Sequence, residues 1–280
     1  MFCDEDPHTL SGFSPKRKES PYFLPMRFAL LFLACTIGTR GAETVSIAAA
    51  ANLVYVLDDL NAEFKRSASD IVITTATGAS GSLVAQIRNG APYDVFLSAD
   101  LDFPLALVQA GQADAKSLVT FAVGRLVLWT ARSDLELTEL TAAVRNPTMR
   151  KLAIANPKTA PYGRAAQQTL EKLGLWSVAQ PKLVLGENIT QTAQFVETGN
   201  ADAGFVAMSL VCSPRLRNHG RWLEIPAYLH APLAHGAVLT SHGATNSAAG
   251  RYLAFLHSAA ARKILERFGY SVPEIKPSGT

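Results

Sequence analysis

Residues 45–76 read VSIAAAANLVYVLDDLNAEFKRSASDIVITTA, and this stretch decides the fold. It opens with a short apolar run at residues 45–50, which is typical of a strand buried on both faces. Apolar side chains then recur at helical spacing from Leu53 to Phe64, with charged residues between them. Residues 71–76 are rich in β-branched side chains and predict a second strand. Strand, helix and strand in this order predict parallel strands with helices on the faces of the sheet.

The same alternation continues along the chain and predicts an α/β fold. Further strands are predicted at residues 95–97, 126–130, 152–154, 183–185, 203–206 and 237–240. Further helices are predicted at residues 83–87, 103–110, 137–144, 165–173, 192–198, 246–256 and 259–268. We expect two lobes, the first from residues 43–124 plus 229–280 and the second from 125–228. The last strand and helices are assigned to the first lobe because they are too few to form a separate α/β unit.

The first 42 residues read as a leader rather than as part of the fold. Met26-Arg27 is followed by an apolar run at residues 28–38 and then by small residues, the pattern of a secretory signal peptide. We expect cleavage after Gly41 or Ala42, export to the periplasm, and Met26 as an alternative start. A lipid anchor at Cys35 is a weaker alternative, because the residues before it do not form the usual box.

Composition excludes several classes of protein. The chain has 26 Lys and Arg against 23 Asp and Glu, too small a basic excess for a protein that coats nucleic acid. Hydrophobic residues make up 48%, which excludes wholesale disorder. Three cysteines do not make a disulfide framework, and removal of the leader leaves Cys212 alone. No apolar run reaches the roughly 20 residues of a membrane helix, which excludes a multi-span membrane protein.

Motifs of catalysis are missing from the sequence. The segment GASGS at residues 78–82 approaches a nucleophile elbow but has Ser82 where the second Gly must stand. There is no P-loop, dinucleotide fingerprint or His-Glu-x-x-His motif. Five histidines near the C-terminal end of the chain lack the spacing of metal ligands, and we interpret them as structural: His219, His230, His235, His242 and His257. We therefore expect no enzyme and no cofactor.

Four strand-to-helix junctions are rich in small, polar and turn residues, and they point to an anion site. They lie at residues 50–52, 77–82, 156–163 and 186–190. Loops at the carboxyl ends of parallel strands form ligand sites, and helix N-termini offer unpaired N–H groups to anions. No junction carries an arginine cluster, so neutral dipoles would hold the anion. Asp94 and Asp100 would repel a dianion, so we expect them to be structural.

Residues 77–100, TGASGSLVAQIRNGAPYDVFLSAD, are the most specific part of the chain. Together with AAAAN at 48–52, PKTAPYG at 157–163 and RFGY at 267–270, they resemble the periplasmic molybdate-binding proteins of ABC transporters. The resemblance covers nearly all of residues 43–272. It implies a type II periplasmic binding fold, with two α/β lobes around a central cleft and a two-strand hinge.

The resemblance also implies the ligand and its contacts. The ligand would be molybdate, and also tungstate. It would be bound by the side chains of Ser80 and Asn52, a backbone contact at Ala51, and the N–H groups of Tyr162 and Ile189. Molybdenum would enter only as the oxyanion, with no direct protein–metal bond. The implied partners are a transmembrane permease with its ATPase; we expect a monomer and no nucleic acid. Some members have a ligand tyrosine where this chain has Ala207.

Three alternatives stay open from the sequence. The same fold could bind another anion, such as sulfate, because pocket size is not visible in a sequence. A hydrolase on an α/β scaffold is disfavoured by the missing nucleophile and base pair. The ligand domain of a regulator would need an added pair of DNA-binding helices, and none precedes Glu43.

Overall fold

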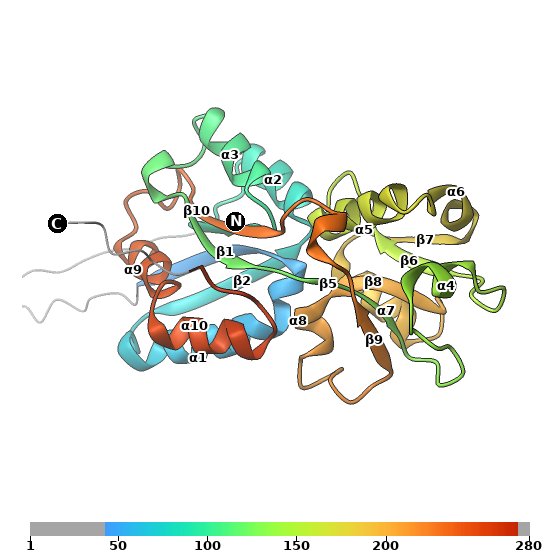
Figure 1. Cartoon of the computed structure of the whole chain (residues 1–280). Coiled ribbons are helices and arrows are strands. Elements are labelled where there is room, and N and C mark those ends of the chain that lie inside the picture. Colours follow the sequence, from blue (N-terminus) through green and yellow to red (C-terminus); the bar gives the residue numbers. More distant parts are fainter. Residues whose placement is uncertain (1–42, 274–280) are drawn as a thin grey trace, which may run out of the picture. The chain divides into compact units, whose positions relative to one another are not determined.

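The computed structural model describes residues 43–273, and these build two five-stranded sheets (Figure 1). The first has the strand order β2-β1-β3-β10-β4 and the second the order β7-β6-β8-β5-β9. We call each sheet with its helices a lobe. The predicted signal peptide and cleavage site, the start at Met26 and the anchor at Cys35 lie outside the described residues.

The strands of the first sheet are β1 (Thr44–Ala50), β2 (Val72–Gly78), β3 (Val95–Leu97), β4 (Val119–Val123) and β10 (Ala234–Leu239). Those of the second are β5 (Leu126–Thr130), β6 (Leu152–Ala155), β7 (Leu183–Gly186), β8 (Ala203–Ala207) and β9 (Arg221–Glu224). β1 pairs in parallel with β2 and β3, and β6 pairs in parallel with β7 and β8. The loops after β1, β2, β6 and β7 therefore leave from the carboxyl ends of parallel strands, where ligands bind.

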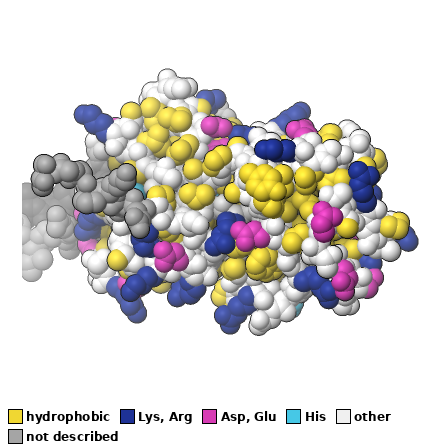
Figure 2. All heavy atoms as spheres, viewed as in Figure 1, with side chains coloured by type: hydrophobic (Ala, Val, Ile, Leu, Met, Phe, Trp, Pro, Cys, Tyr) yellow, Lys and Arg dark blue, Asp and Glu magenta, His cyan; other side chains and the backbone are white. Residues whose placement is uncertain are grey.

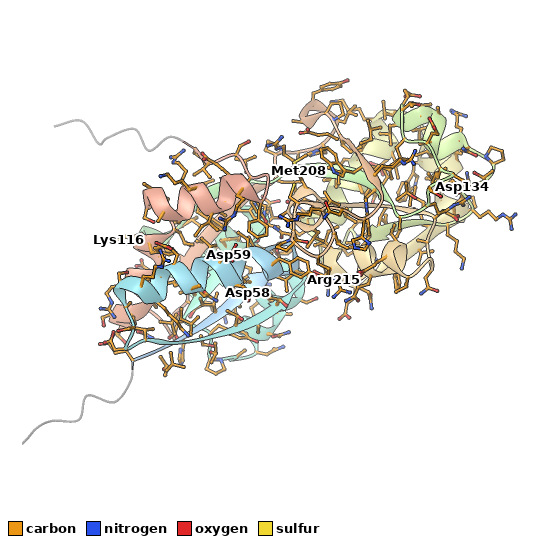
Figure 3. All side chains as sticks on the ribbon, turned by 90° about the horizontal axis from the view of Figure 1, so that it is seen from below. Asp58, Asp59, Lys116, Asp134, Met208 and Arg215 are labelled. Carbon is orange, nitrogen blue, oxygen red and sulfur yellow. The ribbon has the colours of Figure 1, made fainter. Side chains whose placement is uncertain are left out.

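Helices cover both faces of the first sheet. Its helices are η1 (Ala51–Leu53), α1 (Val54–Ser67), α2 (Ser80–Arg88), α3 (Asp102–Gln109), η2 (Ala115–Ser117), α9 (Ser247–Phe255) and α10 (Ala259–Arg267). α1 and α10 lie side by side on one face, with α2 and α3 on the other (Figure 1). Arg267 of α10 pairs with Asp59 of α1 at 2.7 Å; Asp59 is labelled in Figure 3. Between α1 and α9, the Phe64 and Tyr252 rings meet edge to face, with centroids 5.1 Å apart.

The helices of the second lobe are α4 (Leu140–Arg145), α5 (Pro161–Lys172), α6 (Trp176–Ala179), η3 (Gln180–Lys182), α7 (Ile189–Glu197) and α8 (Met208–Val211). α5 buries Ala165, Ala166 and Leu170 on one face, which is the helical spacing of a core-facing stripe. None of the helices within residues 43–273 has both the length and the apolar character that a bilayer crossing requires.

Two connections join the lobes. Gly124 and Arg125 link β4 to β5, and a longer segment containing η4 (Ala227–Leu229) links β9 back to β10. The two connections touch, because the Gly124 N–H donates to the Leu233 carbonyl oxygen at 2.9 Å. β10 lies between β3 and β4, so the last strand of the chain belongs to the first sheet.

The predicted elements are present, but several boundaries differ. The structure begins α5 at Pro161 and α7 at Ile189, where the periodicity predicted starts at 165 and 192. A first-turn proline and the Asn188 cap start these helices earlier than the apolar pattern shows. β4 and β9 were not predicted; β9 is an edge strand whose residues are mostly exposed, so it lacks an apolar run.

Candidate functional site

One small cavity collects all five residues predicted to bind an anion. Its volume is about 10 Å³. Both lobes contribute to its wall, which consists of Ala50, Ala51, Asn52, Gly78, Ala79, Ser80, Ala99, Ala160, Pro161, Tyr162 and Ile189. The four predicted junctions therefore meet at one point.

Each junction brings the start of a helix to the cavity. Ala51 is the first residue of η1, which runs directly into α1, and Ser80 is the first residue of α2. Tyr162 is the second residue of α5, and Ile189 is the first residue of α7. The first N–H groups of a helix have no partner within it and carry partial positive charge. Four helix starts at one cavity gather N–H groups that could donate to an anion.

The caps of the second-lobe helices leave the predicted N–H groups free. The Asn188 Oδ1 atom accepts from the N–H groups of Thr190 and Gln191, both at 3.0 Å, and so bypasses that of Ile189. In α5, Pro161 has no N–H, and the first bond of the helix runs from the Arg164 N–H to the Ala160 carbonyl at 3.0 Å. The Tyr162 N–H therefore lies before the first intrahelical bond.

Ser80 presents a hydroxyl whose proton is free to donate. The side chain is 1% exposed, and its Oγ accepts the Ala99 N–H at 3.1 Å. With that acceptor role filled, the O–H group can donate to a ligand oxygen. Next to it, the Gly81 N–H donates to the Thr159 carbonyl of the second lobe at 2.9 Å. A Cβ at Gly81 would lie 3.1 Å from the Thr159 Cα and 2.9 Å from the Phe103 ring, so this approach of the lobes needs glycine.

The Asn52 side chain is engaged inside the protein. Its Nδ2 lies 2.7 Å from the His235 Nε2 and 2.7 Å from the Tyr270 hydroxyl oxygen. Its Oδ1 is buried without a hydrogen-bond partner among the described residues. Both amide hydrogens thus go to neighbouring side chains, and the donor that Asn52 has left for an anion is its backbone N–H.

Two further contacts across the lobes fix the loop after β1. The Thr190 hydroxyl donates to the Ala51 carbonyl at 2.9 Å, and the Ser209 hydroxyl donates to the Asn52 carbonyl at 2.8 Å. Thr190, Ser209, His235 and Tyr270 were not among the residues predicted to bind the anion. Two of the four carried a signal in the sequence: Thr190 lies in the junction at residues 186–190, and Tyr270 lies in the RFGY segment that carried the resemblance.

The side chains around the cavity are uncharged, and the nearest carboxylates are engaged elsewhere. Asp100 lines a neighbouring larger cavity and accepts from the Ser98 hydroxyl at 3.1 Å and the Phe103 N–H at 3.2 Å. Burial raises the pKa of the Asp100 carboxyl, although Arg164 of the second lobe approaches its Oδ2 at 3.5 Å. Asp94 accepts the Ser46 N–H at 2.7 Å. Both contact sets fit the structural roles expected of these carboxylates.

The end of β8 brings no side-chain donor to the cavity. Ala207 is fully buried and brings no hydroxyl. The next residue, Met208, which Figure 3 labels, starts α8, and its N–H donates to the Arg125 carbonyl at 2.9 Å. Among residues 43–273, no three His, Cys, Asp or Glu side chains gather where they could hold a metal ion.

Comparison with known proteins places the chain in a family. Residues 45–271 match the family described as bacterial extracellular solute-binding protein. The molybdate-binding protein ModA of Azotobacter vinelandii is 38% identical over 253 residues, which cover 88% of this chain and 100% of that protein. ModA of Rhodobacter capsulatus is 41% identical over 229 residues, covering 82% and 88% of the two chains.

A solved structure agrees with this placement. The periplasmic molybdate-binding protein of Azotobacter vinelandii superposes with a TM-score of 0.77 and 32% identity, covering 82% of this chain and 100% of that one. Its fold is the two-lobed binding-protein fold that the sequence predicted. The chain belongs to the bacterial extracellular solute-binding proteins, in the family that contains the ModA molybdate-binding proteins.

Proposed function

We propose that this protein binds molybdate, and tungstate with it, and delivers the oxyanion to the permease of an ABC importer. The observation that carries the proposal is the meeting of four helix starts at one small, uncharged cavity. The kinship with molybdate-binding proteins supports molybdate as the cargo.

The proposed donors match a tetrahedral dianion. Ser80 contributes its hydroxyl, and Ala51, Asn52, Tyr162 and Ile189 contribute backbone N–H groups. A buried dianion is stable only when each oxygen receives hydrogen bonds, and neutral donors can supply them when they are preorganised. Molybdenum is enclosed within its oxygens and forms no bond to the protein. No cofactor takes part.

The transport setting is part of the same proposal. The chain works in the periplasm after export, as a monomer, and serves a transmembrane permease with its ATPase. We expect no catalysis at this site, because its lining residues offer hydrogen-bond donors and do not pair a nucleophile with an adjacent base. On the face shown in Figure 2, basic and acidic side chains are interspersed without a continuous basic surface, which favours partners other than nucleic acid.

A thermal-shift panel on the mature chain tests the cargo. A ligand present at 1,000 times its Kd adds about 4 kcal/mol to the free energy of unfolding, so a true cargo gives a large rise in Tm. We expect molybdate and tungstate to give that rise, and sulfate, phosphate and thiosulfate to give little. A rise with sulfate alone would move the cargo to sulfate. Turnover of a phosphate ester without any anion shift would favour a hydrolase instead.

A further inference from the structure

A buried polar network lies beside the anion cavity and joins three distant parts of the chain. Asn52 comes from η1, His235 from β10 and Tyr270 from the segment after α10, and their exposed fractions are 1%, 0% and 3%. The Asn52 Nδ2 donates to both partners at 2.7 Å. Such a network fixes a side chain in one orientation when each donor has its acceptor.

The partners of His235 determine the direction of these bonds. The His235 Nδ1 lies 2.9 Å from the Leu233 carbonyl oxygen, which can only accept, so Nδ1 carries the proton. The Nε2 atom of the neutral ring is then an acceptor for the Asn52 amide. Turning that amide over would set its Oδ1 against the Nε2 lone pair. The histidine therefore selects one orientation of Asn52.

The same network also holds the backbone of the loop. The Tyr270 hydroxyl donates to the Asn52 carbonyl at 3.2 Å, and the Ser209 hydroxyl donates to the same oxygen at 2.8 Å. The Tyr270 segment is itself fixed, because the Val123 N–H donates to the Ser271 carbonyl at 2.7 Å. With its side chain and its carbonyl both held, Asn52 has little freedom to turn its N–H away from the cavity.

The network reaches the connections between the lobes. The Leu233 carbonyl accepts from the His235 Nδ1 and also from the Gly124 N–H at 2.9 Å. We propose that His235 and Tyr270 are positioning residues of the oxyanion site, which hold Asn52 so that its backbone N–H faces the anion and couple that loop to the interlobe connections. This inference rests on the proposed function, because it assigns how one donor of that site is held.

A pair of tyrosine variants provides the first test. Tyr270→Phe removes the acceptor for the Asn52 amide and the donor to its carbonyl. Tyr252→Phe is the matched control, because this tyrosine is equally buried but its hydroxyl donates to Asn61, away from the cavity, at 2.8 Å. By calorimetry, we expect Tyr270→Phe to raise the Kd for molybdate about tenfold and Tyr252→Phe to leave it within about twofold, while both lower the Tm of the free protein.

A rescue and a double variant separate positioning from structural support. His235→Leu removes the acceptor for Asn52, whereas His235→Gln offers an amide oxygen near the position of Nε2. We expect about a tenfold rise in Kd with Leu and most of the affinity restored with Gln. In an Asn52→Ala background, the His235→Leu substitution should change the Kd by less than about twofold, because the two residues act through one contact.

The outcomes distinguish this inference from the proposed function. If the wild-type protein binds no tetrahedral oxyanion, the proposed function fails and the inference falls with it. If the wild type binds molybdate but Tyr270→Phe weakens binding no more than Tyr252→Phe, the function stands and the positioning role is overturned. Additive effects of Asn52→Ala and His235→Leu on the Kd would overturn it as well.

Discussion

At the scale of single residues, we expect anion binding to depend most directly on the side chain of Ser80. Ser80→Ala removes the hydroxyl donor, and we expect the binding free energy for molybdate to fall by about 1–3 kcal/mol. Calorimetry measures the change. Ser82→Ala, two positions along the same helix and outside the cavity wall, is the control and should bind like the wild type. Equal affinities for Ser80→Ala and the wild type would remove Ser80 from the site.

Residue by residue, sequence could locate the site loops but not the network beside them. Ser80, Tyr162 and Ile189 stand at strand-to-helix junctions, and junction chemistry is a local signal. His235 and Asn52 are 183 positions apart and meet only because β10 returns to the first sheet. A lone histidine carries no sign of such a partner, so it read as structural. For the same reason, the sequence could not show that the Asn52 amide is already hydrogen-bonded to His235 and Tyr270.

At the scale of elements, the short connection through Gly124 depends on the absence of a side chain. A Cβ there would overlap the Tyr162 hydroxyl oxygen and lie 2.7 Å from the His235 Cε1. We expect Gly124→Ala to lower the free energy of unfolding by about 1–3 kcal/mol and to weaken molybdate binding, because Tyr162 must shift. Chemical denaturation and calorimetry measure the two effects.

Gly250 is the matched control for that substitution. It lies inside α9, and a Cβ at this position would meet nothing within 4 Å. Gly250→Ala should therefore raise the free energy of unfolding by up to about 1 kcal/mol, the gain in helix propensity, and leave binding unchanged. If Gly124→Ala behaved in the same way, the crowding at the connection would be disproved.

At the scale of the whole molecule, His235 makes folding stability depend on pH. Burial lowers the pKa of the His235 imidazole from 6.5 to about 4. Between these values the unfolded chain binds a proton that the folded chain does not, so the free energy of unfolding rises with pH across this window. The shift corresponds to about 3 kcal/mol, gained between pH 4 and pH 6.5.

Urea denaturation of the wild type and His235→Gln across that window isolates the contribution of His235. Burial raises the pKa of Asp100, which acts in the opposite direction in both proteins and cancels in the difference. We expect the stability difference between wild type and variant to shrink as the pH falls. A difference that stays constant from pH 7 to pH 4 would show that His235 does not titrate as its burial requires.

The small size of the cavity has a consequence for the choice among anions. With a volume of about 10 Å³, the cavity holds about one water molecule as it stands, so it must widen to admit an oxyanion and has no space for that ion's hydration shell. An oxyanion must therefore lose its bound water before it enters, and the free energy of this dehydration contributes to the selectivity among anions. At equal charge a smaller ion holds its water more strongly, by the inverse dependence of solvation energy on radius. Bulk water thus disfavours the smaller sulfate before any protein contact discriminates against it.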